Sequence, residues 1–148
     1  MFVSAWQEAA APLSTDYTTS MRVPHAPSSV GLARRRMSDE LAEQHVPRPT
    51  VADAALILSE ILSNALRHAR PLGSGHVVVR WNLLLDGTVC VSVTDGGSTT
   101  RPVVGRASVS ALGGRGLGIV DALASEWGVN GPTPGMTTVW ARLPVEPQ

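Results

Sequence analysis

Lysine is absent from this sequence, and all twelve basic residues are arginine. Two common phosphate-binding arrangements, the P-loop and the eukaryotic protein-kinase fold, each use a lysine, so both are excluded. Twelve acidic residues balance the arginines and give a formal net charge of zero. The protein therefore has no overall electrostatic field that would favour nucleic acid or an anionic membrane as a partner.

Cysteine and long apolar runs are also scarce. Cys90 is the single cysteine, so we expect no intrachain disulfide and no cysteine-based metal site, and Cys90 itself is expected to be a packed core thiol. No stretch approaches the roughly 18 apolar residues of a membrane span, and the start lacks the features of a signal peptide. We therefore expect a cytoplasmic protein.

The length and composition predict one compact domain. The chain has 148 residues, of which 43% are hydrophobic, enough for a real core. Residues 1–18 are weakly patterned and are expected to form a flexible tail. The folded domain is predicted to span residues 19–148.

Three helices are expected, at residues 28–45, 51–70 and 115–127. The first would follow a short edge strand at 19–23 and be capped by Ser28 or Ser29, and the second would be capped by Thr50. Its apolar stripe comprises Ile57, Leu58, Ile61, Leu62, Ala65 and Leu66. The run of arginines at 34–36 is interpreted as a solvated helix face, with a partner-binding surface as the alternative.

Two strands are predicted at 76–85 and 88–94, joined by a two-residue hairpin turn at Asp86-Gly87. Along the second strand, valines alternate with Cys90, Ser92 and Thr94, which indicates one buried face and one face nearer a polar site. A glycine-rich loop is expected at 96–114, and two closing strands at 127–130 and 137–143.

The second predicted helix carries a file of polar residues. Glu60, Asn64 and His68 are spaced four apart and so lie nearly above one another, at the border of the apolar stripe. An asparagine is unusual in mid-helix unless its amide is used, and an amide oxygen together with phosphates is a common way to hold Mg²⁺. Glu60, one turn earlier, is placed to accept a proton from a hydroxyl or a water.

Two glycine motifs follow. Asp95-Gly96-Gly97 comes directly after a predicted strand. A carboxylate at this position can accept a hydrogen bond from an exocyclic amine. Taken alone, however, these three residues indicate an ordinary turn. The segment 113–118, which reads Gly-Gly-Arg-Gly-Leu-Gly, leads into a helix, where converging backbone N–H groups and Arg115 favour an anion. It satisfies the dinucleotide-binding pattern only loosely.

The order of these motifs resembles that of the histidine-kinase-like (GHKL) ATPases: Glu-x-x-x-Asn on a helix, Asp-x-Gly after a strand, a glycine-rich turn into a helix, then Gly135 with Thr137 and Thr138. Within that superfamily, residues 58–69 and 113–120 resemble the anti-sigma-factor serine kinases. The resemblance implies an α+β Bergerat fold, a two-layer sandwich with a mixed, mostly antiparallel sheet on about three helices.

The resemblance also implies roles for these positions. Glu60 would be the general base, Asn64 the Mg²⁺ ligand, Asp95 the adenine anchor with backbone support from Gly97, and Arg115 the γ-phosphate contact. The other expected ATP-binding residues are His68, Gly114, Gly116, Leu117, Gly118 and Thr138. Thr99 stands where the family often has a second glycine.

The implied function is a Mg²⁺-ATP-dependent serine/threonine kinase that phosphorylates an anti-anti-sigma protein and binds a sigma factor, as a homodimer. One alternative is a nucleotide-dependent module that sequesters a partner with negligible kinase activity. Another, ranked far lower, is a dinucleotide enzyme.

Overall fold

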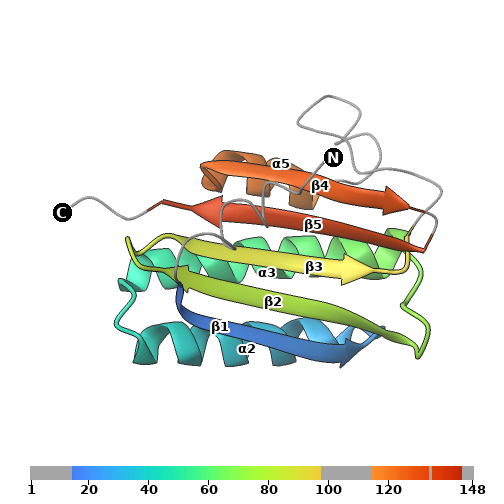
Figure 1. The fold of residues 1–148 in the computed structure, drawn as a ribbon, viewed down its shortest axis with the longest axis horizontal. Coiled ribbons are helices and arrows are strands. Elements are labelled where there is room, and N and C mark those ends of the chain that lie inside the picture. Colours follow the sequence, from blue (N-terminus) through green and yellow to red (C-terminus); the bar gives the residue numbers. More distant parts are fainter. Residues whose placement is uncertain (1–14, 98–114, 134, 145–148) are drawn as a thin grey trace.

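The computed structural model describes residues 15–97, 115–133 and 135–144 (Figure 1). Along the chain the elements are β1 (Thr15–Pro24), α2 (Ser28–Glu43), α3 (Arg48–His68), β2 (His76–Leu84), β3 (Val89–Asp95), α5 (Arg115–Leu123), β4 (Glu126–Thr133) and β5 (Met136–Leu143). None of the helices in these ranges combines the length and the apolar character needed to cross a bilayer.

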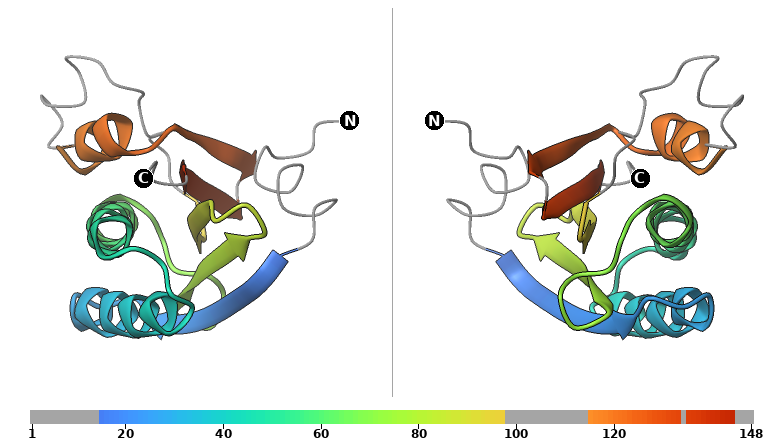
Figure 2. Two further views of the ribbon diagram at one scale, coloured as in Figure 1. Left: turned by 90° about the vertical axis from the view of Figure 1, so that its left-hand side faces the viewer. Right: turned by 90° about the vertical axis from the view of Figure 1, so that its right-hand side faces the viewer.

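The five strands form one sheet in the order β1-β2-β3-β5-β4. Helices α2, α3 and α5 all lie on one face of this sheet (Figure 2). The predicted two-layer α+β sandwich is therefore confirmed. The sheet is not mixed, however, because each of its four neighbouring strand pairs is antiparallel.

The core lies between the two layers. The predicted stripe of α3 is confirmed: five of its six apolar residues are buried and Leu66 is partly buried. Alternate residues of the strands complete this core from the sheet side, namely Val77, Val79, Trp81, Val89, Val91, Val93, Val139 and Ala141. The helix-facing surface of each strand is thus the apolar one.

The predicted helix caps are wrong. Pro27 and Pro47 hold the N-cap positions of α2 and α3 without a side-chain cap hydrogen bond. The Ser29 hydroxyl donates instead to the carbonyl of Pro24 at 2.6 Å, and the buried Thr50 hydroxyl has no partner among the described residues. The prolines explain the difference, since they help begin a helix by restricting the backbone conformation.

Element ends also differ from expectation. β1 begins at Thr15, so residues 15–18 pair with β2 and belong to the sheet instead of the tail. The turn at Asp86-Gly87 is confirmed, with Gly87 at φ 92°, but residues 85–88 all lie outside the strands, so the connection is longer than a two-residue hairpin. Helix α2 ends at Glu43, and α5 ends at Leu123.

The second face of β3, expected to lie nearer a polar site, is also largely buried. Cys90 and Ser92 are each 1% exposed, on the face opposite the helices. The Cys90 thiol is a packed group as predicted: burial raises the pKa of Cys90 to about 12. It therefore stays protonated and unreactive near neutral pH.

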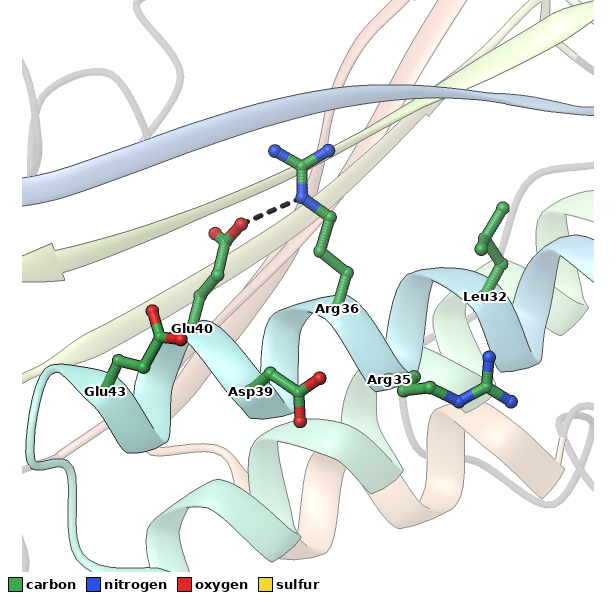
Figure 3. Close-up of a pocket in the computed structure, with 6 residues that line it drawn as sticks. All are labelled: Leu32, Arg35, Arg36, Asp39, Glu40 and Glu43. Carbon is green, nitrogen blue, oxygen red and sulfur yellow. Dashed lines mark hydrogen bonds and ion pairs between the residues drawn. The ribbon is translucent and has the colours of Figure 1, made fainter.

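A partly buried hydrogen-bond network anchors α2 to the sheet. One Glu40 oxygen, Oε1, accepts hydrogen bonds from the Thr19 hydroxyl (2.8 Å) and the Trp81 indole N–H (3.1 Å). The other, Oε2, pairs with Arg36 at 2.8 Å (Figure 3). Because Trp81 is fully buried, its N–H depends on this carboxylate for a partner.

We expect Glu40→Ala to destabilise the fold by about 1–3 kcal/mol, because the indole N–H of Trp81 would be left buried and unpaired. The measurement is the free energy of unfolding from urea denaturation. The control is Glu43→Ala on the same helix, whose side chain is exposed; it is expected to change stability by less than about 0.5 kcal/mol. Equal effects of the two substitutions would contradict the network's role.

Candidate active site

The ends of α3 and β3 are joined by main-chain hydrogen bonds. The Gly96 N–H donates to the carbonyl of Arg70 at 2.7 Å, and the Arg70 N–H donates to the carbonyl of Gly97 at 3.0 Å. Arg70 lies two residues after the end of α3, and Gly96 directly follows the last residue of β3. The polar file of α3 and the Asp-Gly-Gly motif therefore meet at the same end of the molecule.

Both glycines of the motif are required by the backbone. A Cβ at Gly96 would lie 2.1 Å from the carbonyl oxygen of Pro71, a distance that no side chain can occupy. Gly97 has φ 93°, a conformation that glycine adopts without a steric penalty. The close approach of two chain segments thus explains Gly96, and the turn after β3 explains Gly97.

Asp95 is held at the end of β3 with one oxygen engaged. It is 4% exposed, and its Oδ1 accepts a hydrogen bond from the Gly97 N–H at 2.8 Å. Among the described residues no hydrogen bond engages Oδ2, which leaves this oxygen to accept from a ligand. Burial raises the pKa of Asp95, whereas the Gly97 hydrogen bond and the charge of His25 lower it.

The polar file of α3 lies partly in the core. Asn64 is 8% exposed, Glu60 is half-buried and His68, the last residue of the helix, is exposed. Within the described chain the Asn64 amide makes no hydrogen bond, but its oxygen and nitrogen remain accessible to solvent, unlike the unpaired Thr50 hydroxyl. An unpaired amide oxygen that solvent can reach suits a hard cation such as Mg²⁺ held jointly with phosphates and water.

The start of α5 lies toward the same end of the sheet. β3 and β4 run in the same direction, because each is antiparallel to β5. Helix α5 leads into β4 after two residues and runs back along the sheet, so it begins on the Asp95 side (Figure 1). It also packs against α3. The three predicted motifs therefore converge on one region.

The expected phosphate-binding residues are placed only in part. Arg115 and Gly116 open α5, Leu117 is buried and Gly118 is exposed, with space for a close approach to its backbone. Gly114, like Thr99, lies outside the described residues. The positive end of a helix dipole at this position favours an anion.

The strand register separates the two candidate threonines. Thr137 pairs with Asp95 and shares the helix-facing side of the sheet, whereas Thr138 pairs with Thr94 on the opposite side. The hydroxyls of Thr94 and Thr138 lie 2.7 Å apart. Thr137, which is 9% exposed, is therefore the threonine on the same face as the Asp95 carboxylate, and Thr138 is not.

Sequence reasoning also missed His25. It lies in the connection between β1 and α2, and its Nε2 is 3.0 Å from the carbonyl oxygen of Ala69, the C-cap residue of α3. It is the charged group whose field lowers the pKa of Asp95. A histidine between two prolines carries no recognisable motif, so only the fold reveals its position.

A shallow surface hollow lies on the outer side of α2, away from these residues. It is lined by Leu32, Arg35, Arg36, Asp39, Glu40 and Glu43 (Figure 3). None of the predicted site residues contributes to it. In the described ranges, no three His, Cys, Asp or Glu side chains come together as a metal-binding cluster.

Comparison with known proteins identifies the family. A family model described as the histidine kinase-like ATPase domain matches residues 23–143. The chain therefore belongs to the histidine kinase-like ATPase domain family. Membership of a family of ATPase domains implies that the chain binds ATP. No curated protein sequence gives a match.

Two solved structures are similar in fold. The RsbU and RsbW domains of Rv1364c from Mycobacterium tuberculosis match with a TM-score of 0.69 and 23% identity, over 88% of this chain and 33% of that one. The SiaB-SiaC complex from Pseudomonas aeruginosa matches with a TM-score of 0.65 and 13% identity, over 94% and 95% of the two chains. This chain thus spans about a third of the length of the first protein. The TM-scores show a shared fold, and at sequence identities this low the similarity shows the fold alone.

We expect Gly96→Ala to destabilise the protein by about 1–3 kcal/mol, because the added methyl group would push residues 96 and 70 apart. The matched control is Gly31→Ala in α2, where a Cβ meets no atom within 4 Å; it should stabilise the helix by about 0.5–1 kcal/mol. Thermal unfolding of both variants measures the difference. If the Gly96→Ala protein were as stable as the wild type, the pairing of Arg70 with residues 96 and 97 would tolerate a wider separation of the two segments.

Proposed function

We propose that this chain is a Mg²⁺-ATP-dependent serine/threonine protein kinase of the anti-sigma-factor type. It would phosphorylate an anti-anti-sigma protein, bind a sigma factor and act as a homodimer. The observation that carries the proposal is the junction of α3 with the end of β3, because it brings the Glu60 and Asn64 helix to the Asp95 carboxylate. This combination provides a proton acceptor, an amide oxygen and an amine acceptor at one site.

Two further observations support this type of kinase within the family. Residues 58–69 and 113–120 resemble the corresponding segments of anti-sigma serine kinases. One similar structure is of RsbU and RsbW domains, and another is a complex of two proteins, SiaB and SiaC. A protein substrate is therefore the proposed acceptor in preference to a small molecule.

Nucleotide recognition is assigned to the 95–97 segment. The exocyclic amine of adenine would donate to Asp95 Oδ2, the oxygen that no described residue engages, with the backbone of Gly97 beside it. Thr137 lies on the same face of the sheet. Its hydroxyl is better placed than that of Thr138 to complete the adenine pocket.

Phosphoryl transfer is assigned to α3 and to the start of α5. As the substrate hydroxyl oxygen bonds to the γ-phosphorus, the bond from that phosphorus to the ADP oxygen breaks, and Glu60 accepts the hydroxyl proton. Asn64 would hold Mg²⁺, which supplies charge neutralisation on the phosphates when it is bound. Arg115 and the backbone of residues 114–118 would stabilise the γ-phosphoryl oxygens, and His68 would lie at the rim.

Replacing Glu60 by Gln tests the kinase assignment. We expect ATP affinity to stay within about twofold, while phosphoryl transfer to an antagonist protein falls at least about 100-fold, because the proton acceptor is lost. The measurement is incorporation of label from γ-labelled ATP into antagonist proteins encoded by the same organism. The control is Glu43→Gln, an exposed acid on α2, which should retain full transfer.

Equal transfer by the Glu60→Gln protein would remove Glu60 from the mechanism. A wild-type protein that binds ATP but labels none of these proteins would instead support the second candidate, a nucleotide-dependent module that sequesters a partner. Titration with NAD in place of ATP tests the dinucleotide alternative.

Asp95 should make ATP binding sensitive to acid. The ionised carboxylate accepts a stronger hydrogen bond from the adenine amine than the protonated acid does, and burial raises the pKa of Asp95. Affinity is therefore expected to fall as the pH drops through this raised pKa, in less acidic solution than for an ordinary aspartate. Isothermal titration with ATP and GTP at several pH values measures this, because guanine has a carbonyl where adenine has the amine.

The Asp95→Asn variant should bind ATP at least about tenfold more weakly at neutral pH and lose the preference for ATP over GTP. The control is Asp39→Asn, an exposed position on α2. Unchanged selectivity in the Asp95→Asn protein would exclude Asp95 as the adenine anchor.

A further inference from the structure

His25 is attached to the end of α3, at the residue before the one that pairs with the Asp-Gly-Gly motif. Its backbone N–H donates to the carbonyl of Gly75 at 3.1 Å, which fixes the β1–α2 connection against the segment before β2. Its imidazole Nε2 lies 3.0 Å from the carbonyl oxygen of Ala69. Because a carbonyl only accepts, Nε2 must carry the proton in this contact.

Ala69 and Arg70 are held by hydrogen bonds from two separate segments of the chain. His25 donates to the carbonyl of Ala69, and the next residue, Arg70, exchanges two backbone hydrogen bonds with Gly96 and Gly97. Carbonyls at a helix C-terminus lack partners within the helix. The His25 contact therefore satisfies one of them and restrains the two residues that align α3 with the end of β3.

His25 also acts on Asp95 through its charge. The positive imidazole lowers the pKa of Asp95, in opposition to burial, which raises it. Within three residues of His25, Ala69 and Gly75 along the chain, the other charged or titratable side chains are Arg22, Arg67, His68, Arg70 and His76. His25 thus contributes to the site in two separable ways, by a hydrogen bond and by a charge.

We propose that His25 is a positioning residue for the nucleotide site, holding the end of α3 against the 95–97 segment so that the free Asp95 oxygen is aligned for adenine. The proposal rests on the adenine-binding part of the proposed function and is independent of kinase activity. His25 touches neither the nucleotide nor the reacting atoms; it acts through Ala69 and Asp95.

The test compares His25→Ala with His25→Gln in the full-length chain, by isothermal titration with Mg²⁺-ATP across a pH series. We expect His25→Ala to weaken ATP binding about tenfold at neutral pH, because the restraint on Ala69 is lost. His25→Gln keeps an N–H donor for the Ala69 carbonyl and should restore affinity to within about threefold of wild type. Both variants lack the positive charge, so in both the acid-side loss of binding should move to higher pH.

His45→Asn is the matched control. His45 is an exposed histidine at the far end of α2 with φ 66°, and asparagine tolerates this conformation. It should leave both the affinity and the pH profile unchanged. Circular dichroism and thermal unfolding of each variant show whether it is folded.

Three outcomes overturn the proposal. If the wild type binds ATP and folded His25→Ala binds it equally well, the positioning role fails while the proposed function stands. If His25→Gln fails to restore affinity and neither variant shifts the pH profile, His25 has a merely structural role. If the wild type itself binds no ATP, the adenine site and the inference built on it both fall.

Discussion

The pairing of Arg70 with Gly96 and Gly97 is the interaction on which the candidate site depends. It joins the end of the central helix to the end of the central strand through main-chain atoms. Core packing holds α3 on the sheet, and this main-chain contact fixes how the end of the helix lies beside the Asp95 carboxylate. Since the contact is made by the backbone, it constrains the sequence chiefly at Gly96, where any side chain would collide with Pro71.

Glu40 and Asn64 illustrate two different uses of polar side chains in this fold. The Glu40 carboxylate is engaged by Thr19, Trp81 and Arg36 and fastens α2 to the sheet. The Asn64 side chain, by contrast, is 8% exposed, and its amide makes no hydrogen bond in the described chain. An amide that no protein group engages keeps its oxygen and its N–H groups for a ligand. The contrast separates a structural centre from a candidate binding site.

The fold was predictable in its elements but less so at their ends. Apolar residues at helical spacing predicted α2 and α3, and alternation predicted β2 and β3, because periodicity reflects which face each element buries. The ends depended on contacts that periodicity does not encode. Pro27 and Pro47 begin the two helices without a side-chain cap, and β1 starts at Thr15 because its partner β2 extends far enough to pair with it.

For the candidate site, the sequence by itself determined the spacing of Glu60, Asn64 and His68 on one helix face, and the placement of Asp95 directly after a strand. Both follow from local backbone geometry. Only the tertiary structure decided that Thr137 and not Thr138 shares a face with Asp95, and that His25 contacts the end of α3. Strand register and loop docking arise from pairing between distant segments, and local spacing carries no record of which segments meet.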